Sequence, residues 1–149
     1  MRLASWDETQ TLIAAHKGQV VVLDVWSTWC GPCLKEFPSF TELHRQHAGR
    51  VACISLNCNY AGGEPPGTDR EQIEAFLSQH GAAFENVICT DSAQKLFQAL
   101  DAAAIPIVRV YDREGKLRKQ FVNDYEEFGK EGFNYQKHIA PLVEQLLNE

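Results

Sequence analysis

The sequence lacks the features that mark membrane, fibrous and nucleic-acid-binding proteins. No stretch approaches the ~20 apolar residues of a membrane span, and the N-terminus shows no signal-peptide pattern of basic start, apolar run and small-residue cleavage site. No internal repeat or low-complexity tract is present. Positive charge is scarce, with 14 Lys and Arg residues against 20 Asp and Glu residues. The formal net charge of -6 therefore disfavours a sequence-independent grip on nucleic acid or on an anionic membrane.

The composition that remains is that of a folded globular chain. Hydrophobic residues make up 44% of the 149 positions and charged residues 23%, which is typical of soluble proteins. This length suits one core that needs no disulfide or metal to hold it together. We therefore expect a single domain over residues 1–149.

Helix and strand patterns alternate along the chain. Ser5 and Glu8 have capping-box spacing, which predicts a helix near residues 6–16, and the apolar, β-branched run over 20–26 predicts a central strand buried on both faces. The other expected elements are a helix bent at Pro38 (33–47), a strand (51–56), a loop (62–67), a helix capped by Thr68 and Glu71 that ends at Gly81, a strand (84–88), a helix capped by Asp91 (to 100), a strand (105–111), a turn (112–115), its hairpin partner (116–122), a loop (128–134) and a final helix (135–147). This order predicts an α/β fold whose central mixed sheet, flanked by helices, is parallel in its middle and antiparallel at one edge.

The five cysteines cannot all pair within one chain, because five is an odd number. Two of them, Cys30 and Cys33, have a motif spacing. A structural zinc site that adds Cys53 and Cys58 is the alternative, but a predicted helix and strand separate the two pairs, whereas zinc knuckles place both pairs in short turns. The five histidines show no metal spacing with the cysteines, and we expect neither a metal nor another cofactor.

The segment Trp29-Cys30-Gly31-Pro32-Cys33 has the arrangement that thiol-disulfide exchange requires. Cys30 comes at the expected start of a helix, where unpaired amides and the macrodipole favour a thiolate, and Cys33 is one turn further along. Cys33 can therefore resolve a mixed disulfide between Cys30 and a substrate. Gly31 permits close approach, Pro32 fits the first helical turn and Trp29 can shield the pair.

Asp24 is the one polar residue in the apolar run before the cysteines, six positions ahead of Cys30. Ionising a carboxyl there is costly, so we expect a raised pKa and a role as proton acceptor. A structural Asp at the strand end is the alternative.

The stretch from Val22 to Cys33 resembles the active-site segment of thioredoxins, and Ala104-Ile105-Pro106-Ile107 resembles the segment of that family that carries a cis-proline. The resemblance implies a thioredoxin-like fold with a cis Pro106 beside the cysteines and with Ile105 in contact with extended substrate. A trans Pro106 that merely begins an edge strand is the alternative. In many thioredoxins a lysine on the neighbouring strand faces the buried Asp, where this chain has Ser55.

The 72 residues between Cys33 and Pro106 exceed what a minimal thioredoxin needs, and the surplus is a helix and strand at about 60–90. This insertion, together with Cys33-Leu34-Lys35-Glu36-Phe37-Pro38, resembles the TlpA/ResA group of extracytoplasmic thioredoxin-like proteins. The resemblance singles out Glu36 as a modulator of the thiols, with a solvated helix carboxylate as the alternative. Members of that group generally reduce specific disulfides, including those of apocytochrome c or its helpers, so the resemblance implies a reductase with chosen protein partners but does not say which. We also expect a monomer that is regenerated by an external donor such as a thioredoxin-type or membrane reductase.

The cellular compartment stays open. The resemblance suggests an extracytoplasmic or periplasmic protein, whereas the missing signal peptide suggests a cytoplasmic one.

The other three cysteines are expected to differ in their surroundings. We expect Cys53 to be a buried small apolar residue. Cys58 and Cys89 each follow a predicted strand at the edge of the sheet that carries Cys30, and a second disulfide between them is an alternative to two free thiols.

Two rival functions stay open beside disulfide reduction. A thiol peroxidase of peroxiredoxin type would use Ser27 as its hydroxyl residue, but Leu23 replaces the proline of that motif. A non-catalytic binding module would use thiol exchange only as a latch on its partner.

Overall fold

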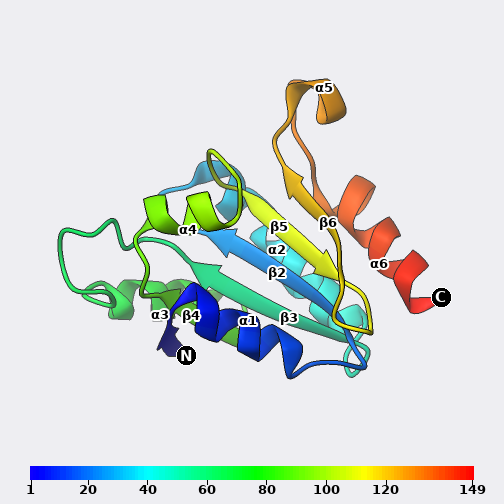
Figure 1. Cartoon of the computed structure of the whole chain (residues 1–149), viewed down its shortest axis with the longest axis horizontal. Helices are drawn as coiled ribbons and strands as arrows, with labels where there is room; N and C mark the ends of the chain where they lie inside the picture. The colour runs from blue at the N-terminus through cyan, green and yellow to red at the C-terminus, as the bar shows by residue number, and fades with distance from the viewer.

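A six-stranded mixed sheet with helices on both faces forms the protein in the computed structural model, which describes residues 1–149 (Figure 1). The strand order is β1-β4-β3-β2-β5-β6, in which β1 to β4 are parallel neighbours and β5 and β6 are antiparallel. The elements are β1 (Arg2–Ala4), α1 (Trp6–Ala14), β2 (Val20–Trp26), α2 (Gly31–Gln46), β3 (Val51–Asn57), α3 (Arg70–Gln79), β4 (Glu85–Cys89), α4 (Ala93–Ala99), β5 (Ile107–Tyr111), β6 (Leu117–Val122), α5 (Tyr125–Phe128), the π-helical segment η1 (Tyr135–Ile139) and α6 (Ala140–Leu147). The predicted α/β architecture, with an antiparallel hairpin at one edge, is confirmed.

The buried strand β2 divides the apolar core into two halves. Val20, Val22 and Trp26 pack with α2, α3 and α6, whereas Val21 and Leu23 face the opposite way, toward α1 and α4. This alternation is the two-residue period of a strand that is covered on both faces. Asp24 shares the parity of Val22 and Trp26, so the sequence of β2 alone directs its carboxyl toward α2 and α6.

The extra helix and strand predicted at about 60–90 are α3 and β4, and β4 adds to the sheet beside β3. The sequence prediction missed β1, which pairs with β4 in parallel and places Leu3 opposite Ile88. Three residues are too few to display the alternation by which a strand is identified.

Two predicted helix caps are wrong, although both helices exist. Thr68 donates its hydroxyl to the Pro65 carbonyl and lies outside α3, which begins after Asp69 without a side-chain cap. The cap of α4 is Ser92, whose hydroxyl accepts from the Lys95 amide, whereas Asp91 accepts from the Trp6 amide and so links α4 to α1. In contrast, the capping box of Ser5 and Glu8 is present.

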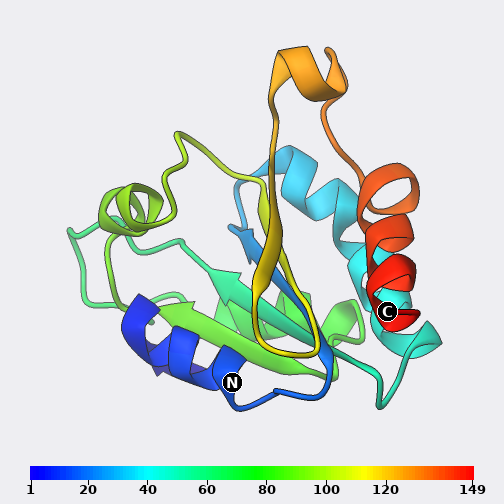
Figure 2. The same ribbon diagram turned by 45° about the vertical axis from the view of Figure 1, so that its right-hand side comes forward.

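The chain after β6 leaves the sheet and returns to it. Figure 2 shows α5 standing away from the sheet, after which a loop leads back to η1 and α6 beside α2. The loop is held by Asn123, whose side-chain oxygen accepts from the Phe133 amide at 3.1 Å. A side chain at Gly132 would collide with Asn123, so only glycine permits this path. None of the helices combines the length and the apolar character needed to cross a membrane.

Candidate active site

The turn between β2 and α2 brings Cys30 and Cys33 together in a disulfide, with their Cα atoms 5.3 Å apart. Cys30 is the N-cap of α2, and its sulfur accepts from the Cys33 amide at 3.3 Å. Pro32 lies in the first helical turn, where its missing amide hydrogen costs no helical bond. One amide of the helix start thus donates to the sulfur expected to act as nucleophile, at a helix N-terminus that favours a thiolate.

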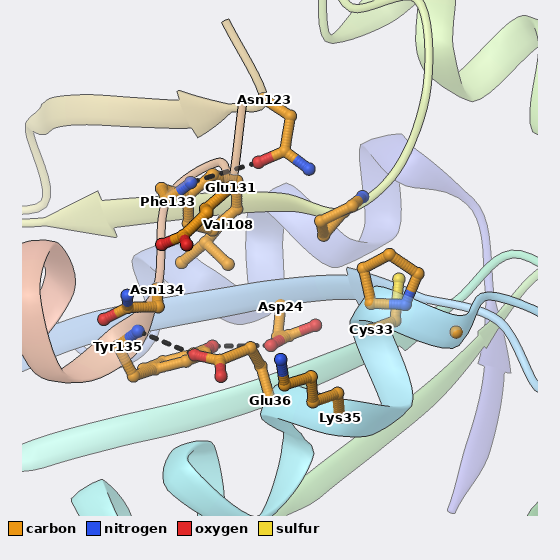
Figure 3. A pocket seen from close by; sticks show the side chains of 13 residues that line it. Asp24, Cys33, Lys35, Glu36, Val108, Asn123, Glu131, Phe133, Asn134 and Tyr135 are labelled. Atoms are coloured by element: carbon orange, nitrogen blue, oxygen red, sulfur yellow. Dashed lines mark hydrogen bonds between the residues drawn. The ribbon is translucent and has the colours of Figure 1, made fainter. Parts of the chain in front are cut away.

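A pocket of about 440 Å³ opens beside the disulfide (Figure 3). It lies between the start of α2, strands β2 and β5, and the returning chain before η1. The residues that line it are Asp24, Gly31, Pro32, Cys33, Lys35, Glu36, Pro106, Val108, Asn123, Glu131, Phe133, Asn134 and Tyr135. Six of these, Asp24, Gly31, Pro32, Cys33, Glu36 and Pro106, were predicted from the sequence as site residues, and they come from three separate parts of the chain.

The Asp24 carboxyl points from β2 into this pocket and is 4% exposed. Burial raises its pKa from the ordinary 3.8 to about 7; a hydrogen bond from Tyr135 opposes the rise and the charge of Glu36 adds to it. Ser55 lies opposite Asp24 in the register of β3, as predicted, but gives its hydroxyl hydrogen to Asn86. The β3 residue opposite Asp24, where many thioredoxins have a lysine, therefore does not bind the Asp24 carboxyl, and its hydrogen-bond partner comes from elsewhere in the chain.

That partner is Tyr135, which no sequence pattern identified. Its hydroxyl donates to Asp24 Oδ2 at 2.5 Å, and its backbone amide donates to Glu36 Oε1 at 2.9 Å. The lone buried Asp24 did signal that some donor was required, because buried carboxyls need partners. Nothing in the local pattern chose among four tyrosines, however, since this one is 111 residues away in sequence.

Glu36 is half-buried, and its contact with the Tyr135 amide argues against the alternative of a purely solvated helix carboxylate. It occupies the second turn of α2, one turn beyond Cys33. The helix thus carries a sulfur and a carboxylate on the same wall of the pocket (Figure 3).

The predicted substrate-contact residues divide into two groups. Pro106 follows a cis peptide bond, as predicted, and lines the pocket together with Gly31 and Pro32. Ile105 does not line the pocket and instead packs against both halves of the core. Trp29, which directly precedes Cys30 in the sequence, is 65% exposed and does not line the pocket.

Cys53, Cys58 and Cys89 are free and buried, so the second disulfide considered for Cys58 and Cys89 is not formed. Burial raises the pKa of the Cys58 thiol to about 12 and that of Cys89 to about 11, and it also raises the pKa of Cys53. No group of three or more His, Cys, Asp or Glu side chains is arranged to hold a metal ion. The four-thiol zinc arrangement weighed above therefore has no geometric counterpart.

Comparison with known proteins relates this arrangement to one family. The family model described as Redoxin matches residues 2–135. Thiol-disulfide oxidoreductase ResA of Bacillus thuringiensis is 30% identical over 126 residues, which are 84% of this chain and 66% of the relative. The ResA protein of Bacillus subtilis is 29% identical over 104 residues, or 69% of this chain and 52% of the relative. The chain thus matches less than two thirds of the length of these relatives.

Solved structures of similar fold extend the comparison. The crystal structure of a thiol-disulfide isomerase from Corynebacterium glutamicum aligns with a TM-score of 0.67 and 18% identity, covering 90% of this chain and 84% of that one. This likeness confirms the thioredoxin-like fold.

Proposed function

The chain belongs to the Redoxin family and is a thioredoxin-like protein of the TlpA/ResA type, and from this premise we propose that it catalyses thiol-disulfide exchange. In the proposed reaction it reduces disulfide bonds in proteins, with Cys30 as nucleophile and Cys33 as resolving thiol. The observation that carries the proposal is the disulfide at the N-terminus of α2, open to a pocket that also holds the buried carboxyl of Asp24.

The proposed reaction transfers two electrons from the dithiol to the substrate. The Cys30 thiolate attacks one sulfur of the substrate disulfide, and the other sulfur leaves as a thiolate that takes up a proton. The Cys33 thiol then loses its proton and its sulfur attacks Cys30, which releases the second substrate sulfur. The Cys30–Cys33 disulfide remains, as found in this structure, and an external dithiol donor reduces it to restore the enzyme.

Asp24 is the proposed proton acceptor for Cys33. Both groups line one pocket, and a carboxyl whose pKa is raised to about 7 can both accept and release a proton near neutral pH. Glu36, which also lines the pocket, is proposed to modulate this exchange through its charge.

Substrate contact is proposed for Gly31, Pro32 and Pro106 at the pocket rim, with Ile105 contributing through its backbone. Trp29 offers an exposed aromatic side chain next to the nucleophile, and exposed aromatic residues are favoured in protein recognition. Disulfide-containing proteins are the proposed substrates, a thioredoxin-type or membrane reductase the proposed donor, and a monomer the proposed state.

Equilibration in thiol-disulfide buffers of defined potential tests the proposal. Free thiols are trapped by alkylation and counted by intact mass for the wild type, for Cys30→Ser and for Cys53→Ala as the matched control. We expect one reversible two-electron couple in the wild type and in Cys53→Ala, and none in Cys30→Ser. A couple that survives Cys30→Ser would contradict the assignment.

The position of the couple tests the direction of the reaction. A potential near the thioredoxin value of about -270 mV supports a reductase, and one near the DsbA value of about -120 mV reverses the direction. Multiple turnovers of a disulfide substrate with excess reductant separate catalysis from a thiol-latched binding module. Hydrogen peroxide offered in place of the disulfide tests the thiol peroxidase alternative.

A further inference from the structure

Tyr135 connects the two carboxyl groups of the pocket. Its hydroxyl donates to Asp24 on β2, and its backbone amide donates to Glu36 on α2. Figure 3 shows the phenol extending from the returning chain between these two side chains. One residue at the start of the last helical segment thus contacts both strand and helix of the thiol site.

The phenol of Tyr135 is buried, and the chain on both sides of it is held by hydrogen bonds. Tyr135 is 3% exposed, and its ring packs on Phe40 with a centroid distance of 5.6 Å. Asn134 caps the helical segment by accepting from the Lys137 amide at 2.8 Å. The preceding residue, Phe133, is bound through its amide to Asn123. The hydroxyl is therefore a fixed donor that needs no rearrangement to meet the Asp24 carboxylate.

The groups around Asp24 leave Tyr135 as the one side chain that donates a hydrogen bond to it. Strand β3 presents the uncharged Cys53 thiol and, opposite in register, Ser55, whose hydrogen goes to Asn86. Strand β5 presents Val108 opposite Asp24. The other polar or charged groups that face the carboxyl or line its pocket are Cys33, Lys35 and Glu36 of α2, Cys58 after β3, and Asn123, Glu131 and Asn134 of the returning chain.

We propose that Tyr135 is the positioning residue that keeps Asp24 in its proton-accepting form, and that Glu36 acts on the same carboxyl in the opposite sense. A hydroxyl that donates to a carboxylate stabilises the charged form, whereas a second carboxylate nearby destabilises it. Glu36 also accepts a hydrogen bond from the Tyr135 backbone amide. Tyr135 therefore contacts both the carboxyl that it stabilises in the charged form and the carboxyl that opposes this effect. The proposal rests on the thiol-disulfide exchange proposed above, and it names the two residues, Tyr135 and Glu36, that adjust the proton affinity of Asp24.

Tyr135 keeps its own proton throughout the reaction. Burial and the adjacent carboxylates raise its pKa well above the ordinary value, so the phenol acts as donor only. The proton lost by Cys33 moves to Asp24 and from there to the pocket solvent, while the Tyr135 hydrogen bond persists. Tyr135 is therefore a positioning residue and takes no part in bond making or breaking.

Titration of Asp24 by carboxyl ¹³C NMR on the oxidised protein is the direct test, with Asp24→Asn to assign the signal. In Tyr135→Phe, which keeps the ring and removes the donor, we expect the midpoint to rise by about one unit, a tenfold fall in the ratio of ionised to protonated carboxyl at a given pH. In Glu36→Gln, which keeps an acceptor for the Tyr135 amide but removes the charge, we expect the midpoint to fall. Tyr125→Phe, which alters a 74% exposed tyrosine, is the matched control and leaves the midpoint unchanged.

The pH profile of disulfide reduction is a second measure of how Tyr135 and Glu36 affect the protonation of Asp24. Its acid limb should shift upward in Tyr135→Phe and downward in Glu36→Gln, in step with the NMR midpoints. A merely structural role for Tyr135 would weaken folding in both variants without moving the midpoints in opposite directions. Midpoints that stay fixed, or that move the same way, overturn the proposal.

The test also separates this proposal from the function on which it rests. If the wild type reduces no disulfide while the NMR midpoints move as expected, the proposed function fails and the pairing of Tyr135 with Asp24 stands. If reduction proceeds and the midpoints do not move, the function stands and the proposed tuning is wrong.

Discussion

The pair Cys30 and Cys33 and the pair Cys58 and Cys89 occupy two regions of the molecule, which differ in the structure that the chain forms after the strand; Cys53 lies inside β3. Cys30 comes after β2, Cys58 directly after β3, and Cys89 ends β4, so all three lie at the carboxyl edge of parallel strands. A 16-residue helix begins at Cys30 and a pocket opens beside its partner Cys33, whereas Cys58 and Cys89 are fully buried in an apolar cluster. Cys30 and Cys33 are themselves only 7% and 3% exposed, so neither the sheet edge nor burial alone separates the two regions. The difference is the helix N-terminus at Cys30 and the pocket beside Cys33.

The largest expected difference between the two regions is in catalysis. Cys30→Ala should reduce disulfide turnover to the uncatalysed background, because the attacking sulfur is gone. Cys58→Ala should leave turnover unchanged, since that thiol is completely covered by the core. Insulin reduction with excess dithiothreitol measures both variants. Loss of turnover in a well-folded Cys58→Ala protein would remove the distinction between the regions.

A second test concerns the carboxyl that only the first region has. The pKa of Asp24 is raised in the folded protein to about 7 from an ordinary 3.8, so its stabilising contribution is complete below about pH 4 and is lost as the pH rises through 7. Asp24→Asn, which cannot ionise, should gain stability relative to the wild type as the pH rises from about 3 to 8, by as much as about 4 kcal/mol over that whole range. Urea unfolding of the oxidised proteins measures this difference. An equal pH dependence in the two proteins would show that Asp24 is not perturbed by folding.

Alkylation of the native protein tests the second region. Because burial raises the pKa of Cys89 to about 11, its thiolate fraction near pH 8 should be on the order of 100-fold lower than that of an ordinary thiol. The reduced native protein should therefore take up iodoacetamide first at Cys30, the N-cap thiol of α2, and at Cys53, Cys58 and Cys89 only on unfolding. Peptide mass mapping after timed quenching locates each label. Early labelling of Cys58 or Cys89 would contradict their burial.

The smallest expected effect is that of Trp29. Trp29→Ala should leave the potential and the pH profile unchanged, because the indole lies outside the pocket. It should raise KM for a protein disulfide by roughly fivefold, the loss of about 1 kcal/mol of contact, and leave KM for a small disulfide unchanged. Steady-state kinetics with the two substrates makes the comparison. Equal effects on both would show that Trp29 acts on the thiols and not on the partner.

The local sequence pattern was sufficient to predict those features that a single stretch of the chain determines. The apolar run of β2 and the Cys30-to-Cys33 spacing each carry their own physical reason, so strand, helix start and disulfide could all be predicted. The direction of the Asp24 pKa shift followed from a single polar residue in that run.

Prediction from the sequence failed for features that depend on contacts between segments far apart in the chain. Strand β1 forms because it pairs with the edge of β4, and the three residues Arg2–Ala4 show no sequence pattern that would predict a strand. Asp91 has the chemistry of a helix cap but serves the amide of Trp6, which is 85 residues away in sequence. Tyr135 became visible as a site residue only when η1 was placed against β2 and α2.

The long separation between Asp24 and Tyr135 affects how the protein is made. At about 5–20 residues per second, a ribosome needs roughly 6–22 s to add the 111 residues that separate them. During that interval the thiols of Cys30 and Cys33 have left the decoding centre, but the tyrosine that completes their pocket has not been synthesised. The nascent chain thus carries both sulfurs well before it carries the finished proton acceptor. Full exchange activity should accordingly appear only after the C-terminal helix has emerged and docked.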